Sequence, residues 1–311
     1  MIFFVVFIRF IYFIAAKVII LMKPIPSSEL VLNADGSIYH LKLLPEQLAE
    51  RVIVVGDQGR VEEISRHFDR IEHKVQNREF VTHTGVYRGK RITALSTGIG
   101  TDNIDIVMNE LDALVNIDLE NRMPKLEKQT LEIVRIGTSG TICEDIPVDS
   151  VLASTHGLGF DGLLHFYQFQ PNADEKALTD AIIKALNLPE NLNTPYVVEG
   201  NLELFKKMSP GYFTGITATA SGFYGPQGRQ IRLEPAVPDL NERMMQFRFG
   251  EHRITNFEME TSALFGLAQL LGHKAATVCV IIANRARKEY SKNYKPPMQQ
   301  LIVDVLDRLS S

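Results

Sequence analysis

The sequence predicts an α/β sandwich built largely on one mixed sheet. Short runs rich in β-branched residues alternate with helical patterns along most of the chain. A hairpin signal at 88–90 separates two neighbouring strands, so the sheet contains antiparallel as well as parallel pairs. No repeat, low-complexity tract or proline-rich linker divides the chain. Residues 28–311 are therefore predicted to form one domain.

The first elements of this domain follow from local patterns. A buried strand is predicted at 51–55, and the turn 56–60 leads into a helix that reaches Phe68. Two strands follow, at 80–87 and 91–96, on either side of the hairpin turn.

Residues 97–100 then open an amphipathic helix that is predicted to pack on the sheet. Its apolar residues recur at the i, i+3, i+4, i+7 spacing: Ile104, Val107, Met108, Leu111, Leu114 and Val115. In the rest of the chain, strands are predicted at 131–136, 148–153, 215–220 and 276–282, and helices at 174–186, 259–271 and 297–309.

Composition and charge restrict the class of protein. The chain has 311 residues, of which 45% are hydrophobic and 23% charged, so it can bury a large core. The net charge is −4, and Lys and Arg are spread along the chain, which argues against a nucleic-acid partner. Both cysteines, Cys143 and Cys279, lie in apolar surroundings. They are predicted to be free thiols in a reducing compartment, and a cytoplasmic location is expected.

An apolar N-terminal extension, residues 1–22, stands apart from this composition. Arg9 and Lys17 interrupt it, which disfavours a transmembrane anchor, and it lacks a convincing cleavage site for a signal peptide. The third interpretation is that Met22 is the true start, because the composition changes abruptly there. A membrane partner is expected only if this segment is retained.

Glycine-containing segments follow three of the predicted strands, at 56–60, 96–100 and 135–140. We interpret them as turns, in which glycine lets backbone N–H groups approach an anion closely. A single example would most simply be a tight βα turn. Three in one chain, two of them carrying arginine, favour phosphate. The second does not complete a dinucleotide fingerprint, because Asn103 stands at its third glycine position.

Three arginines stand beside predicted strand ends: Arg60, Arg78 and Arg135. The planar guanidinium can bind phosphate oxygens in pairs. Arg135 is embedded in an apolar run, so it requires a partner, which the residues alone leave open as a protein carboxylate or a ligand.

Two further segments carry polar groups suited to a nucleoside. Glu258 and Glu260 flank Met259 at a predicted strand-to-helix junction, where they either cap the helix or bind the hydroxyls of a sugar. The segment 223–229 combines an aromatic side chain with Gln227 and Arg229. It is either an ordinary surface loop or one that stacks on a base and reads its edge.

Metal and hydrolase signatures are absent from the sequence. The eight histidines are scattered, without an HxxxH pair or a cysteine at ligand spacing. The sequence also contains no Gly-x-Ser-x-Gly elbow and no Walker loop. No metal and no cofactor are predicted.

Taken together, these segments resemble the nucleoside phosphorylase family, and within it the uridine phosphorylases. The resemblance covers nearly all of the chain from residue 28 onward. It implies a three-layer α/β/α sandwich with a partly barrel-like central sheet. It also implies phosphorolysis of uridine to uracil and ribose 1-phosphate, a pentosyl transfer of pyrimidine salvage in which inorganic phosphate is the co-substrate. The motifs that carry it are 56–61, 77–80, 96–100, 135–138, 223–229, 257–260 and 282–285.

The resemblance also implies a role for each matching residue. Phosphate is expected at Gly56, Arg60, Arg135 and Thr138, with Arg78 supplied by a neighbouring subunit. Ribose is expected at Glu258, Met259 and Glu260, with His40 of a neighbouring subunit near the 5′-hydroxyl. The base is expected at Phe223, Gln227, Arg229 and Ile282. The residues expected to act in catalysis are Arg229, Gln227, Arg135 and Thr138.

A site shared in this way implies a homo-oligomer of this chain, for which a dimer is the minimum and a hexamer is the larger alternative. Two departures from the family pattern are Gln58, which stands at a usual proline position, and the segment 101–103, which replaces a stretch of smaller residues. Asp102 in this segment would repel a nearby phosphate unless its side chain points away.

A pyrimidine base is preferred over a purine, because purine-type relatives carry an aspartate within the stretch that corresponds to 281–285, where this chain has none. Uridine is preferred over cytidine because an arginine donor suits a carbonyl oxygen and is left unpaired against an amino group. Three alternatives stay open at this point: a purine or broad-specificity phosphorylase, a nucleosidase that uses water, and a non-catalytic nucleoside-binding protein.

Overall fold

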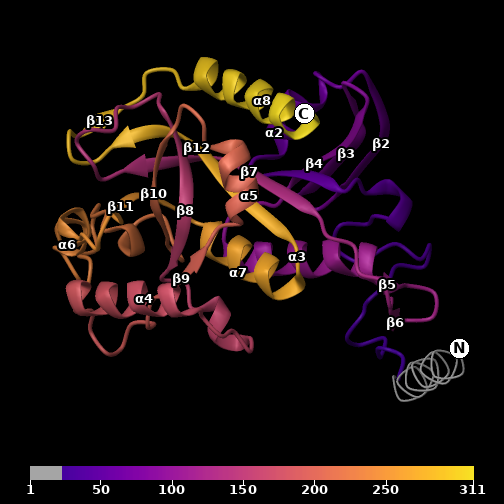
Figure 1. Ribbon diagram of the computed structural model, residues 1–311, viewed down its shortest axis with the longest axis horizontal. Helices are drawn as coiled ribbons and strands as arrows, with labels where there is room; N and C mark the ends of the chain where they lie inside the picture. Colours follow the sequence, from indigo (N-terminus) through magenta and orange to yellow (C-terminus); the bar gives the residue numbers. More distant parts are fainter. Residues whose placement is uncertain (1–22) are drawn as a thin grey trace, which may run out of the picture.

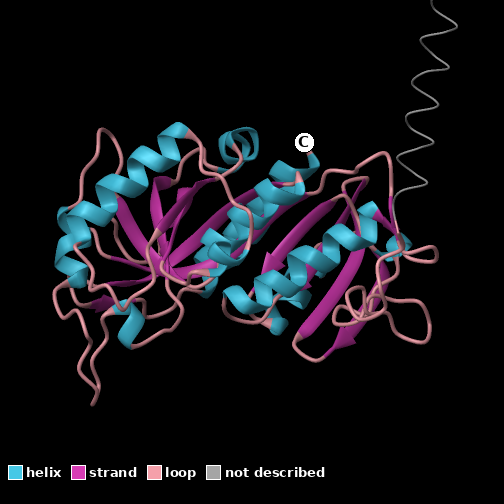
Figure 2. Ribbon diagram, turned by 90° about the horizontal axis from the view of Figure 1, so that it is seen from below, coloured by secondary structure: helices cyan, strands magenta, loops and turns pink. Residues whose placement is uncertain are grey.

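The computed structural model describes residues 23–311, and the predictions for 1–22 lie outside the described residues. One sheet of eleven strands dominates the fold, with helices on both of its faces (Figures 1 and 2). Within residues 23–311, no helix is both long and apolar enough to cross a membrane.

The strands of the large sheet have the order β13-β12-β8-β10-β11-β7-β1-β4-β3-β2, with β9 beside β8, while β5 and β6 pair separately. In chain order the strands are β1 (Arg51–Val55), β2 (Arg70–Asn77), β3 (Phe80–Tyr87), β4 (Lys90–Ser96), β5 (Ile117–Asp118), β6 (Met123–Pro124), β7 (Glu132–Thr141), β8 (Val151–Gly159), β9 (Tyr196–Glu199), β10 (Phe213–Thr219), β11 (Ile254–Glu258), β12 (Lys274–Asn284) and β13 (Glu289–Tyr290). The α-helices are α2 (Gln58–Ser65), α3 (Thr101–Asn116), α4 (Ala173–Leu186), α5 (Leu202–Met208), α6 (Leu240–Gln246), α7 (Thr261–Leu271) and α8 (Lys295–Ser310), and the 3₁₀ turns are η1 (Pro45–Gln47), η2 (Leu163–Phe166) and η3 (Gly225–Gln227).

Part of the sheet closes into a barrel. β12 pairs with both β7 and β8, β8 pairs with β10, and β10 pairs with β11. The ring closes because β11 pairs antiparallel with β7, through Asn256 opposite Thr141 and Phe257 opposite Gly140. The strands β1, β4, β3 and β2 extend from β7 as an open sheet. The predicted partly barrel-like sheet is confirmed.

Side chains of β1 point alternately to the two helical layers. Val52 and Val54 belong to the core that includes residues of α3 and α7, whereas Ile53 and Val55 belong to the core formed with α2 and α8. The predicted apolar face of α3 lies in the first of these cores. A third core joins strands of the ring to α4 and α6.

The predicted hairpin between β3 and β4 is confirmed. Tyr87 pairs with Lys90, and the two residues between them, Arg88 and Gly89, have φ values of 46° and 76°. Positive φ at both positions is the geometry of a tight two-residue turn. Parallel pairs such as β1 with β4 lie next to this antiparallel hairpin, so the sheet is mixed as predicted.

Several predicted boundaries are wrong. β7 continues to Thr141 instead of ending at residue 136, because β12 pairs with it along this whole stretch, and 135–140 is therefore strand and not a turn. β8 begins at Val151 and not at residue 148, because Asp149 has a φ of 66° in the preceding turn. α2 ends at Ser65, before Phe68.

Candidate active site

A cavity of about 740 Å³ opens where the chain leaves several strands of the sheet. Its wall combines the segments that follow β1, β4 and β11 with the second half of β7, the end of β12 and the loop before α6. All predicted site residues except His40 and Arg78 line it: Gly56, Arg60, Arg135, Thr138, Phe223, Gln227, Arg229, Glu258, Met259, Glu260 and Ile282.

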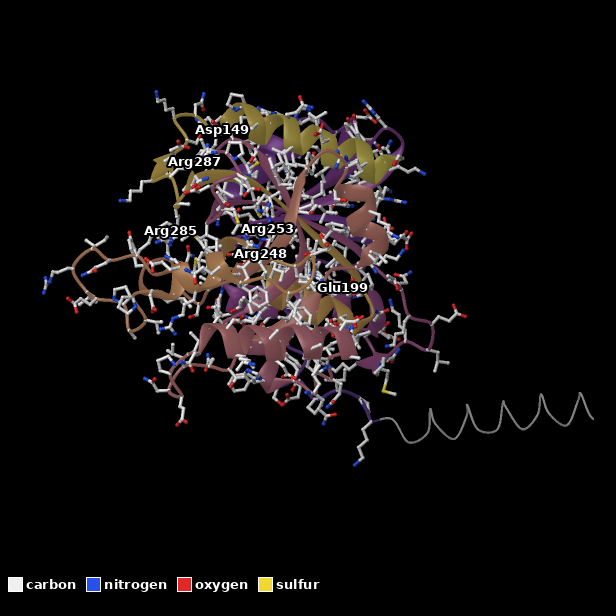
Figure 3. All side chains as sticks on the ribbon, turned by 60° about the vertical axis from the view of Figure 1, so that its left-hand side comes forward. Asp149, Glu199, Arg248, Arg253, Arg285 and Arg287 are labelled. Carbon is white, nitrogen blue, oxygen red and sulfur yellow. The ribbon has the colours of Figure 1, made fainter. Side chains whose placement is uncertain are left out.

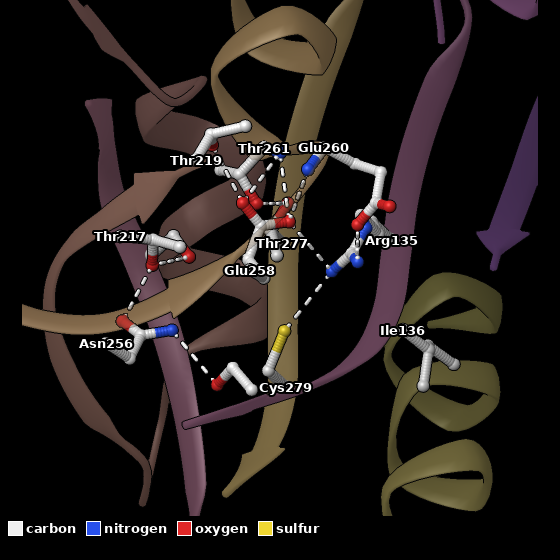
Figure 4. A network of polar contacts seen from close by, with 12 residues as sticks. Arg135, Ile136, Thr217, Thr219, Asn256, Glu258, Glu260, Thr261, Thr277 and Cys279 are labelled. Atoms are coloured by element: carbon white, nitrogen blue, oxygen red, sulfur yellow. Dashed lines mark hydrogen bonds and ion pairs between the residues drawn. The ribbon is translucent and has the colours of Figure 1, made fainter. Parts of the chain in front are cut away.

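Arg135 lies at the centre of a buried charged group (Figure 4). Its Nη1 is 3.3 Å from Glu258 Oε2, and its Nη2 forms an ion pair with Glu260. Nη1 also donates to Cys279 Sγ at 3.3 Å. Burial by itself lowers the pKa of Arg135, but Glu260 and Glu258 outweigh it, and the pKa is raised. The arginine is therefore a fixed cation, and the partner that the sequence left open is a pair of carboxylates.

The antiparallel pairing of β11 with β7 brings the two glutamates to Arg135. Beyond Phe257, which pairs with Gly140, the chain runs back alongside β7 towards Arg135. Glu258 then accepts hydrogen bonds from Thr219 Oγ1 at 2.7 Å and from Thr261 N at 3.0 Å, at the start of α7. This capping fixes the turn that carries Met259 and Glu260.

Glu260 is held from two sides. Its Oε1 accepts the N–H of Gly100 at 2.8 Å, immediately before α3, while its Oε2 faces Arg135. Burial raises the pKa of Glu260, and Arg135 partly opposes this effect. The carboxylate and the half-buried Met259 line the same part of the cavity.

Arg60 is a buried cation without an acidic partner. It lies in the first turn of α2 with only 8% of its surface exposed, and its Nη1 donates to Ile136 O at 3.3 Å. Within residues 23–311 it forms no ion pair with a carboxylate. Burial lowers its pKa, which Asp57 opposes and the nearby Arg135 reinforces. A cation in such a position is suited to bind a small anion from the cavity.

In another part of the cavity wall, Arg229, Gln227 and Phe223 form one unit. Arg229 Nη1 donates to Phe223 O at 2.6 Å and to Gln227 Oε1, and its guanidinium carbon lies 3.8 Å from the centre of the Phe223 ring. Burial and the neighbouring Arg285 lower the pKa of Arg229 to about 10.

Arg285, which sequence reasoning did not assign, fixes this loop. It lies between β12 and the loop before α6 (Figure 3) and donates to Gln227 O and, at 3.1 Å, to Gly228 O. Its pKa is lowered by burial. The two backbone bonds hold the turn that presents Gln227 and Arg229 to the cavity.

His40 and Arg78 lie outside the cavity lining, and they lie together. Asn77, which precedes Arg78, donates from Nδ2 to His40 O at 2.8 Å. The Arg78 guanidinium stands 5.7 Å from the ring centre of Tyr39, next to His40. Arg78 is exposed and has a φ of 53° at the β2–β3 turn. The two residues predicted to act in a neighbouring subunit thus form one cluster that does not line the cavity of its own subunit.

The two departures from the family pattern have structural consequences. Gln58 lines the cavity and donates from Nε2 to Arg78 O at 3.2 Å. Asp102 is exposed and does not line the cavity, so its carboxylate is not among the groups that would face a phosphate there.

Sequence reasoning missed several residues of the cavity wall. Some of these residues lie next to predicted residues in the same motif, so the motif could have been used to find them. Tyr290 follows β12 after a turn and carried no such signal. The residues missed are Asp57, Gln58, Glu79, Gly98, Ile99, Asn103, Gly137, Ser139, Gly140, Phe257, Ala283 and Tyr290. Throughout the described part of the chain, no group of three or more His, Cys, Asp or Glu side chains is placed to hold a metal ion.

Comparison with known proteins identifies the family of this chain. The profile of the Phosphorylase superfamily matches residues 50–305. A uridine phosphorylase of Thermococcus kodakarensis is 30% identical over 268 residues, which cover 86% of this chain and 84% of that protein. A uridine phosphorylase of Haemophilus influenzae is 28% identical over 258 residues, 82% of this chain and 89% of that protein.

A solved structure is similar throughout. The nucleoside phosphorylase of Trypanosoma brucei, described as showing uridine phosphorylase activity, superposes with a TM-score of 0.83 at 30% identity. The superposition covers 90% of this chain and 99% of that one. This chain therefore belongs to the phosphorylase superfamily, and within it to the nucleoside phosphorylases of the uridine phosphorylase family.

Proposed function

We propose that this protein is a uridine phosphorylase, which transfers the ribosyl group of uridine to inorganic phosphate. The observation that carries the proposal is that three kinds of group line one cavity. Arg60, which has no acidic partner within residues 23–311, donates to Ile136 O on β7, and the Met259–Glu260 segment lies beside Arg135. The unit of Phe223, Gln227 and Arg229 brings Arg229 close to Gly140, further along β7. These groups suit phosphate, ribose and a planar base, respectively.

The proposed reaction needs no covalent intermediate with the protein. The bond between C1′ and the base nitrogen breaks, and its electron pair stays on the base. Gln227 and Arg229 stabilise the resulting base anion with hydrogen-bond donors that are already in place. A phosphate oxygen, positioned by Arg60, Arg135 and Thr138, then forms the new bond to C1′. The phosphate gives up its proton when this bond forms and the base anion takes up one proton, so the products are uracil and ribose 1-phosphate.

Support for a pyrimidine comes from Asn284, in the stretch where purine-type relatives carry an acid. Asn284 is fully buried, and its Nδ2 donates to Cys143 O at 3.0 Å and to Ile146 O at 2.8 Å. Its Oδ1 accepts the N–H of Arg287 at 2.9 Å. Every polar group of this side chain is thus bonded to backbone, and none is directed to a base.

The proposal includes a homo-oligomer in which His40 and Arg78 complete a neighbouring subunit's cavity, with the hydroxyls of ribose at Glu260. It is supported by the clustering of both residues outside their own cavity. A cytoplasmic location is supported by the two free, buried cysteines and is tested by cell fractionation.

The deciding experiment follows uracil release from uridine with and without phosphate, beside thymidine and inosine. We expect phosphate-dependent cleavage with uridine as the best of the three substrates. Cleavage that persists without phosphate indicates a nucleosidase, and faster cleavage of inosine indicates a purine enzyme. Calorimetric binding of uridine without any product indicates a binding protein.

A further inference from the structure

Glu110, on α3, binds the segment that carries His40. Its Oε1 accepts the backbone N–H of His40 at 3.0 Å and lies 2.6 Å from His40 Nδ1. Its Oε2 accepts the N–H of Leu41 at 2.8 Å. The Glu110 side chain is only 13% exposed and does not line the cavity. One carboxylate therefore fixes both the backbone and the ring of His40.

This contact determines which nitrogen of the ring is available. A carboxylate accepts hydrogen bonds and donates none, so the ring nitrogen that faces Glu110 carries the proton. Nδ1 of His40 is that nitrogen, and Nε2 forms no hydrogen bond within residues 23–311. The His40 side chain keeps 28% of its surface exposed. In its neutral form, a ring held in this way presents Nε2 as a free acceptor.

The backbone around His40 is fixed as well. Asn77 binds the carbonyl of His40, and Asn33 Nδ2 donates to the carbonyl of Ile38 at 3.0 Å. Tyr39 packs edge-on against the His40 ring, with 4.8 Å between the ring centres. The acceptor thus has a defined direction before any ligand arrives, which is what positioning by a supporting residue requires.

We infer that Glu110 is a positioning residue that holds His40 as the Nδ1–H tautomer, so that Nε2 accepts a hydrogen bond from the 5′-hydroxyl of the nucleoside in a neighbouring subunit's cavity. The inference rests on the proposed function and deepens it, because it names the carboxylate that holds His40 in place for this contact.

The experiment compares kcat/KM for uridine and 5′-deoxyuridine in the wild type, Glu110→Ala, His40→Ala and the double variant. Loss of one hydrogen bond between substrate and protein corresponds to roughly tenfold in kcat/KM, and we expect this preference for uridine in the wild type. Each single variant should lose most of the preference. The double variant should lose no more than either single one, because both changes remove the same interaction.

Matched variants separate positioning from general damage. Asp112, two residues further along α3, also faces a histidine, with 3.3 Å between Oδ1 and His273 Nε2. Asp112→Asn should leave the preference for uridine unchanged. Glu110→Gln keeps the side-chain volume but offers one acceptor oxygen to three N–H groups, so it should also lose the preference. It serves as the test if Glu110→Ala does not fold.

Two results would overturn the inference while the proposed function stands. One is a wild type that cleaves uridine with phosphate yet treats 5′-deoxyuridine equally well. The other is an equal loss of activity towards both substrates in the Glu110 variants, which is the signature of a purely structural role. Absence of phosphate-dependent cleavage by the wild type would instead overturn the proposed function, and this inference with it.

Discussion

The guanidinium of Arg135 lies over the backbone of Gly137, two residues further along the same face of β7. A Cβ added at Gly137 would overlap Arg135 Nη1 and lie 2.9 Å from Cys279 Sγ. The Arg135 guanidinium thus occupies the space that a side chain at residue 137 would fill. This is a requirement for close approach and not for a special φ, because Gly137 is in extended strand.

We predict that Gly137→Ala displaces Arg135 and lowers kcat/KM for phosphate by about a hundredfold, since misplacement of a group that fixes a reactant is costly. Steady-state kinetics with phosphate as the varied substrate measures this change. Gly140→Ala is the matched comparison for stability. A Cβ there meets its nearest neighbour at 3.8 Å, so its thermal unfolding should match that of the wild type. Unchanged phosphate kinetics in Gly137→Ala would contradict the prediction.

Removal of the Arg135 charge should destabilise the protein strongly. Arg135→Met leaves Glu258 and Glu260 buried and without a cation, for which we expect a loss of about 3–5 kcal/mol in the free energy of unfolding. Urea denaturation at one fixed protein concentration measures it. Adding Glu258→Gln and Glu260→Gln to this variant should restore much of the loss, and failure to do so would point to packing as the cause.

The raised pKa of Glu260 predicts how stability depends on pH. The folded protein holds a proton on Glu260 at pH values where the unfolded chain has already lost it, so this proton stabilises the fold. Its contribution to the free energy of unfolding is complete below the ordinary pKa of about 4.5 and is lost as the pH rises through the pKa of the folded state. Urea midpoints of the wild type should therefore fall relative to those of Glu260→Gln as the pH rises above 4.5. Parallel profiles for the two proteins would rule out this assignment.

The base end of the cavity is tested at Arg229. Arg229→Ala should lower kcat by at least about a hundredfold, because a donor that stabilises the departing base anion is lost. Arg232, an exposed arginine of the same loop that does not line this cavity, is the control, and Arg232→Ala should retain nearly full turnover. Equal effects of the two substitutions would indicate that the loop, and not Arg229, matters.

Subunit mixing tests whether Arg78 acts in a neighbouring cavity. Arg78→Ala and Arg229→Ala protein, each nearly inactive alone, should regain activity when unfolded and refolded together. In a mixed pair, one cavity receives an intact Arg78 from one subunit and an intact Arg229 from the other, so about a quarter of all sites are restored. If both changes acted within one subunit, mixing would restore nothing.

Eleven of the thirteen residues predicted for the site line the cavity, because they lie in short motifs with a chemical meaning. The fold was predicted less completely. β2 is an edge strand of mixed polarity, and β9 has only four residues, so neither has a distinctive pattern. Beyond Gly137, the pairing of β7 with β12 overrides what looked like a glycine turn. Such pairings join residues far apart in the chain, and no local pattern reveals them.

The contacts of Arg135 with Glu260, and of His40 with Glu110, were also hidden for this reason. They span 125 and 70 residues, respectively. Arg135 required a partner, and Glu260 was known as an acidic residue at a junction, yet only the antiparallel return of β11 shows that they meet. The family resemblance supplied the roles of both residues but not the bonds that hold them.

In helix α3, the number of residues between Gly100 and Glu110 is more tightly constrained than the identity of the residues in between. The N–H of Gly100 at its start binds Glu260, and the carboxylate of Glu110 further along binds His40. Inserting or deleting one residue between these two points would turn one contact by about 100° relative to the other. Substitutions on the exposed side of α3 are tolerable, whereas a one-residue insertion or deletion would detach either Glu260 or His40. Related chains that share this site should therefore keep the spacing from Gly100 to Glu110 without gaps.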